Sequence, residues 1–114
     1  MLSSLIFTSL ILGNLILSKV EAPKVEPMEI LLDRLAICES SGRKNAINIM
    51  DGDASSFGLF QFKIKSFVHF GRRYGLEHSD IWSSEQQRAI AKALIEDGRG
   101  QQHFKNCWRK LNLL

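Results

Sequence analysis

Glu39 is the residue of this chain best placed to do chemistry. It ends an apolar, helix-like segment directly after Cys38, and a polar stretch rich in Gly, Ser, Asn and Asp follows it. The chain then becomes aromatic and apolar over residues 57–62. This order suits an acid at the edge of a groove, with the aromatic segment forming the opposite wall. Such an arrangement fits cleavage of a glycosidic bond, because that reaction needs a carboxylic acid to protonate the leaving oxygen.

An isolated glutamate is more often a surface residue, so the case for Glu39 depends on its surroundings. A bridged Cys38 would hold its backbone firmly, and the Ser-Ser-Gly that follows leaves room for a ligand. The C-terminal end of a helix disfavours negative charge, and partial burial does the same. We therefore expect the pKa of Glu39 to be raised.

Other chemistries find little support in the sequence. His69, His78 and His103 do not lie at a familiar metal-ligand spacing with the cysteines. Ser40 and Ser41 lack a Gly-x-Ser-x-Gly frame. We expect no metal and no organic cofactor.

The bulk composition bounds the class of protein. The 114 residues make one domain at most, and the net charge of +3 helps approach to an anionic surface such as a cell wall. The basic residues are scattered, so we expect no nucleic-acid partner. We expect a monomer.

The N-terminal segment predicts export. Residues 5–17 form an apolar run of 13 residues, which suits a signal peptide. Residues 1–18 carry no charge and are only just long enough to span a bilayer, so a membrane tether stays open. We assign residues 1–22 to a signal peptide or anchor, 23–27 to a linker and 28–114 to the domain. The expected location is secreted or in the cell envelope.

Cys38 and Cys107 make an even cysteine count, which in an exported chain suggests one disulfide. It would join the end of the first helix to the last helix and stabilise the fold by about 4 kcal/mol on the chain-entropy model. The alternative is two buried free thiols.

The elements that must position these residues are mostly helices. A helical stripe leads to Glu39, and residues 40–56 suggest a loop or short hairpin. Further helices are expected over about 63–74, from a Ser83 or Ser84 cap to about residue 96, and over about 101–111, with Gln86 or Gln87 placed for a capping box. The fold class is therefore mainly α, with at most a short β-hairpin.

The aromatic residues divide by spacing. Phe67, Phe70 and Phe104 lie at helical spacing and are expected in the core. Another three alternate along the chain, so that one face of them could stack on a sugar: Phe57, Phe60 and Phe62.

Three segments together carry a family resemblance: Ile37–Gly42, Ala46–Asn48 and Ser56–Phe62. They resemble the lysozyme-like transglycosylase superfamily, above all the soluble-lytic-transglycosylase and resuscitation-promoting-factor catalytic domains. In both, a helix ends in Glu-Ser and a Gly-Leu-hydrophobic-Gln element follows. A Cys before the Glu, paired with a Cys near a C-terminal aromatic, is similar to the second group. The resemblance covers roughly residues 28–110.

The resemblance implies a lysozyme-like α+β fold and a role for five residues. Glu39 matches the general acid/base and Gln61 a glutamine lining the groove. Gly58 and Leu59 match backbone that meets the sugar, and Ser40 a serine that orients the acid. A tight turn and a helix cap explain the last three equally well. The chain lacks the later Asn-Tyr motif of the larger enzymes.

The resemblance also implies a substrate. It is the β-1,4 bond between N-acetylmuramic acid and N-acetylglucosamine in peptidoglycan, cleaved by a lytic transglycosylase. The alternatives are a lysozyme-type hydrolase and an inactive peptidoglycan-binding module.

A second carboxylate stays an open question. Two-carboxylate glycosidases place the groups about 5–9.5 Å apart. Asp51 and Asp53 are near in sequence, but Asp-Gly-Asp is also typical of a turn. Because the related transglycosylases use one acid, we expect Glu39 alone, with Asp53 in reserve.

Overall fold

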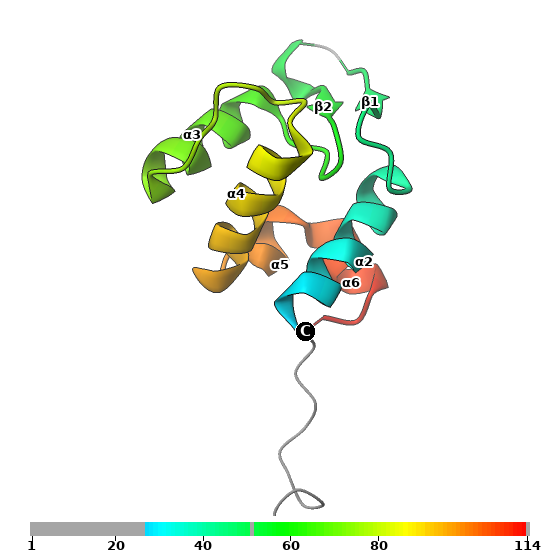
Figure 1. Ribbon diagram of the computed structural model, residues 1–114. Coiled ribbons are helices and arrows are strands. Elements are labelled where there is room, and N and C mark those ends of the chain that lie inside the picture. The colour runs from blue at the N-terminus through cyan, green and yellow to red at the C-terminus, as the bar shows by residue number, and fades with distance from the viewer. Residues whose placement is uncertain (1–26, 51, 114) are drawn as a thin grey trace, which may run out of the picture.

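The computed structural model describes residues 27–50 and 52–113. The elements in chain order are α2 (Met28–Ser40), β1 (Ile47–Asn48), the 3-10 helix η1 (Gly52–Ala54), β2 (Ser56–Phe57), α3 (Ile64–Tyr74), α4 (Ser84–Glu96), α5 (Gly100–His103) and α6 (Lys105–Lys110). The fold is mainly helical with one antiparallel hairpin, as the sequence predicts. In Figure 1, α4 lies centrally, and it contacts α2, α3 and α5.

The core gathers around the inner face of α4. Helical periodicity places Ile90, Ala91 and Leu94 on that face, and all three are fully buried. Leu32 and Leu35 of α2 are equally inaccessible. These apolar rows pack the helix that carries Glu39 against the centre of the domain.

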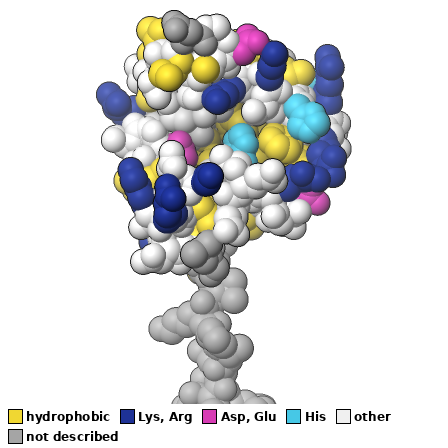
Figure 2. Space-filling view, turned by 180° about the vertical axis from the view of Figure 1, so that it is seen from behind, with side chains coloured by type: hydrophobic (Ala, Val, Ile, Leu, Met, Phe, Trp, Pro, Cys, Tyr) yellow, Lys and Arg dark blue, Asp and Glu magenta, His cyan; other side chains and the backbone are white. Residues whose placement is uncertain are grey.

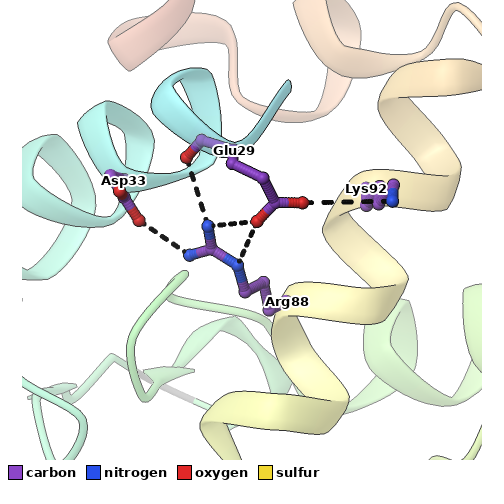
Figure 3. Close-up of polar contacts among 4 residues, drawn as sticks. All are labelled: Glu29, Asp33, Arg88 and Lys92. Carbon is purple, nitrogen blue, oxygen red and sulfur yellow. Dashed lines mark hydrogen bonds and ion pairs between the residues drawn. The ribbon is translucent and has the colours of Figure 1, made fainter. Parts of the chain in front are cut away.

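Charged contacts add a second connection between α2 and α4 (Figure 3). The Arg88 guanidinium on α4 lies 2.7 Å from Glu29 Oε2 and 2.9 Å from Asp33 Oδ1, and it also donates to the Glu29 carbonyl. Lys92 lies 3.9 Å from the other Glu29 oxygen. Exposed pairs of this kind contribute about 0–1 kcal/mol each, so they orient α2 more than they stabilise it.

A disulfide joins α2 to α6, which confirms the predicted Cys38–Cys107 pairing. Cys107 is buried and Cys38 is half-buried against the core. The bond fixes the backbone one residue before Glu39. The end of α2 is therefore held by α6, through the disulfide, as well as by its packing against α4.

The C-terminal helix differs from the prediction. Instead of one helix over about 101–111, the chain forms α5 and α6 with a break at Phe104, whose φ and ψ are −97° and 43°. The break turns the Phe104 ring into the core, against Phe60 and Phe62. The break also places the residues of α5 and Cys107, which lies on α6, in separate helices.

The expectation for the alternating phenylalanines was wrong for two of the three. Phe60 and Phe62 are fully buried, because core packing covers both faces of this segment. Phe57 is half-buried against Trp82, with ring centroids 5.5 Å apart. Phe67 is buried as expected, whereas Phe70 is only partly covered. Phe70 is therefore free to line the cavity described below.

The predictions for the N-terminal signal peptide, anchor and most of the linker fall on residues 1–26, outside the described residues. Within residues 27–50 and 52–113, no helix is long and apolar enough to cross a membrane.

Candidate active site

A cavity of about 660 Å³ lies between the end of α2, the loop after β2, α3 and α5. Figure 2 shows this face of the molecule, where apolar and histidine side chains lie in a hollow with Lys and Arg side chains around it. The lining includes both residues that the sequence paired as acid and groove glutamine, Glu39 and Gln61. The other lining residues are Ser56, Phe60, Lys63, Lys65, Ser66, His69, Phe70, Arg99, Gln102, His103, Phe104, Lys105 and Asn106.

Glu39 is half-buried in this cavity, one residue before the end of α2. Burial raises the pKa of its carboxyl to about 7, because the charged form loses water, and nearby Lys110 opposes that rise. The direction is the one expected from the sequence. At neutral pH a large share of the Glu39 side chains therefore carries a proton that can be donated.

The chain turns sharply after Glu39. Ser41 adopts a left-handed conformation with φ 58°, and the Ser41 and Gly42 amides donate to carbonyls of the last helical turn. The buried Ser40 hydroxyl donates to the Ala36 carbonyl at 2.9 Å. Ser40 does not line the cavity, so its hydroxyl serves the helix end, which was the alternative explanation.

Gln61 occupies a constrained position in the opposite wall. Its φ is 53°, a left-handed conformation that is uncommon for a residue other than glycine. Its Nε2 donates to the Gly58 carbonyl at 3.0 Å and to the Ala46 carbonyl at 3.2 Å. The amide thus ties the loop after β2 to the segment before β1, which holds this wall in place.

Gly58 and Leu59 lie behind that wall. Gly58 has φ 79°, and a Cβ there would lie 2.5 Å from the Gln87 amide nitrogen. Leu59 packs against the core, and neither residue lines the cavity. Their positions match the tight-turn explanation better than direct contact with a ligand.

Gln87 of α4 is the supporting residue that sequence reasoning missed. Its Oε1 accepts from the Phe60 amide at 2.8 Å, while its Nε2 donates to the carbonyls of Phe57 and Ile81 at 2.8 and 2.6 Å. The side chain is fully buried. The sequence carried one signal: Gln87 precedes Ile90 and Leu94 on the same apolar row, where a polar side chain needs buried partners. The helix cap forms at Ser83, one of the two predicted positions, where the hydroxyl accepts from the Gln86 amide.

His103 forms part of the cavity wall. Its ring lies 5.0 Å from Phe62 and 5.4 Å from Phe70, measured between centroids. Burial, together with nearby Lys63, lowers the pKa of His103 to about 4. The imidazole is therefore neutral near pH 7 and can act as a hydrogen-bonding group without adding charge to the cavity.

Glu39 is the one carboxylate among the described residues that line the cavity. Asp53 is exposed outside it, paired with Lys65 at 2.8 Å, and this lysine lowers the pKa of Asp53. Asp51 lies outside the described residues. The described residues also hold no cluster of three or more His, Cys, Asp or Glu side chains that could bind a metal ion.

The site combines a half-buried acid of raised pKa with an amide-bearing wall and a basic rim. Proton donation to a ligand oxygen is the chemistry that this arrangement supports. Comparison of the chain with models of protein families, with curated proteins and with solved structures finds no match.

Proposed function

We propose that this chain is an exported enzyme that cleaves the β-1,4 bond between N-acetylmuramic acid and N-acetylglucosamine in peptidoglycan, with Glu39 as the general acid and then the base. The family resemblance suggests the substrate, and the location of the acid supports the chemistry. The observation that carries the proposal is Glu39 itself, a carboxyl with a pKa of about 7 in the wall of a cavity that also holds Gln61.

The proton transfers of the reaction can be carried out by a single acid. Glu39 donates its proton to the bridging oxygen as the bond from that oxygen to C1 of N-acetylmuramic acid breaks. The Glu39 carboxylate then accepts the proton of the sugar's own 6-hydroxyl while that oxygen bonds to C1. The product is a 1,6-anhydro end, and Glu39 is protonated again.

The presence of one carboxylate among the described lining residues favours a lyase over a hydrolase. A two-carboxylate hydrolase needs a second group about 5–9.5 Å from the acid. Among the described residues lining the cavity, Glu39 has no such partner. Mass spectrometry of the released fragments separates the outcomes, since a lyase leaves anhydro ends and a hydrolase leaves reducing ends.

The disulfide supports the proposed location. A Cys38–Cys107 bond persists in oxidising compartments, such as the exterior of the cell. The cell envelope is also where the proposed substrate lies.

The direct test is Glu39→Gln, assayed on purified sacculi beside Glu96→Gln. Glu96 is an exposed glutamate at the end of α4, outside the cavity, so the control removes the same charge. We expect at least about 100-fold lower activity for Glu39→Gln and little change for the control. Binding to sacculi by the wild-type protein, without released fragments, would favour a binding module instead.

A further inference from the structure

Four cationic side chains line the cavity, and they are not equivalent. Lys65 is paired with Asp53 at 2.8 Å, and Arg99 with Asp97 at 2.8 Å. The remaining two, Lys63 and Lys105, have no acidic partner among the described residues. The uncompensated positive charge of the lining is therefore concentrated on Lys63 and Lys105.

These two lysines come from distant segments of the chain and line the same cavity. Lys63 follows Phe62, and Lys105 follows Phe104, and the two rings pack with centroids 6.1 Å apart. His103 lies against both rings, and the positive charge of Lys63 helps to lower the pKa of His103. Both lysines therefore flank the wall that His103 forms.

Among the described residues, no other side chain of that wall balances their charge. His103 is neutral near pH 7. Glu39, the one carboxylate among the described lining residues, is half-buried and largely protonated below that pH. A ligand that carries negative groups would supply the missing counter-charge, whereas a neutral glycan would leave both ammonium groups facing it unpaired.

We propose that Lys63 and Lys105 form a recognition site for carboxylate groups carried by the peptidoglycan strand, so that the groove prefers an acidic strand to a neutral one. This inference rests on the proposed function and names the substrate chemistry of the same site. Lys63 and Lys105 bind and position the strand, while Glu39 acts on the bond. The attraction is solvent-exposed, so it weakens as the salt concentration rises.

The test measures binding in a Glu39→Gln background, so that the glycan stays intact. The probe is purified sacculi, untreated or with their carboxylates converted to neutral amides by carbodiimide coupling to methylamine. Lys63→Gln/Lys105→Gln is compared with Lys44→Gln/Lys92→Gln. The control removes the same charge from exposed positions outside the cavity.

We expect Lys63→Gln/Lys105→Gln to bind untreated sacculi about tenfold more weakly, since an exposed ion pair contributes up to about fivefold. Amidation of the sacculi should weaken binding by the parent protein, Glu39→Gln, by a similar factor. It should leave binding by this double variant unchanged. The control pair should change binding less than about twofold. Thermal unfolding of each variant checks that the fold is intact.

Equal binding of the parent to untreated and amidated sacculi would overturn the inference, as would equal losses for the two double variants. Cleavage assays with intact Glu39 keep the two proposals apart. Cleavage of both kinds of sacculi, together with binding that ignores amidation, would reject carboxylate recognition and leave the proposed activity standing. Cleavage of neither kind, together with binding that ignores amidation, would reject both proposals.

Discussion

The Gln87 side chain holds the Phe60 backbone across the domain, with Oε1 2.8 Å from the Phe60 amide nitrogen. Gln87 lies on α4, and Phe60 lies in the loop that carries Gln61. The same side chain also anchors the Phe57 carbonyl, so one buried amide fixes both ends of this wall of the cavity. The central helix thus sets the position of a loop that has little regular structure of its own.

Gln87→Leu should damage both stability and the site. The substitution leaves the buried Phe60 amide and the Ile81 carbonyl without the Gln87 partner, while the Phe57 carbonyl keeps the Phe62 amide. We therefore expect a loss of about 3 kcal/mol in the free energy of unfolding. Gln86→Leu is the matched control, because its side chain makes only exposed hydrogen bonds, to Asp80 and Ser79. Urea unfolding measures both, and an equal effect of the two substitutions would contradict the role of Gln87.

Glu39→Gln should become more stabilising as the pH rises. Burial holds the pKa of Glu39 at about 7 in the folded state, above its ordinary value of 4.5. Below pH 4.5 both states are protonated, and between pH 4.5 and 7 only the unfolded state loses the proton, which lowers the stability of the wild type. Because Glu39 is partly exposed, we expect the Gln variant to gain about 1–3 kcal/mol over this window.

Urea unfolding of both proteins at pH 4.5 and pH 8 checks this expectation. The comparison between variants is necessary because His103 acts in the opposite direction. Its pKa is lowered to about 4, so His103 reduces stability as the pH falls from 6.5 toward 4. A stability difference between wild type and Glu39→Gln that does not change with pH would show that Glu39 is solvated.

Lys110→Gln should extend activity to higher pH. The acid form of Glu39 donates the proton, so kcat/KM should fall as the pH rises through about 7. Lys110 lowers the pKa of Glu39, and its removal should move this alkaline limb upward. Lys44→Gln, which removes an exposed charge away from the cavity, should leave the limb in place. A downward shift for Lys110→Gln would contradict the assignment of the limb to Glu39.

Opening the disulfide should cost about 4 kcal/mol of stability, since the bond closes a long loop of the unfolded chain. The measurement is urea unfolding with and without reductant, with Cys38→Ala/Cys107→Ala as the control that reductant should not affect. Thiol titration of the denatured, unreduced protein should find no free thiol. Two free thiols would contradict the bond.

The sequence predicted the features that depend on local pattern. Helical periodicity places Leu32 and Leu35 inward, and the turn-forming residues after Glu39 indicate the loop that follows α2. An even cysteine count gave the disulfide. Burial at a helix end gave the direction of the Glu39 pKa shift.

The features that depend on tertiary contacts could not be predicted from the sequence. The alternating pattern predicted that one face of Phe60 and Phe62 could stack on a sugar. The surrounding helices instead bury both of these side chains completely. The break at Phe104 violates the helical pattern of its own segment and is explained by the position of its ring in the core. Lys63 and Lys105 looked like ordinary surface charges until the fold placed them in one cavity.

The rate at which soluble muropeptides are released from sacculi tests the central claim most directly. We predict that the wild-type protein releases fragments with 1,6-anhydro ends, and that Glu39→Gln releases them at least about 100-fold more slowly while remaining folded. Release by Glu39→Gln at the wild-type rate would contradict the assignment of Glu39 as the proton donor.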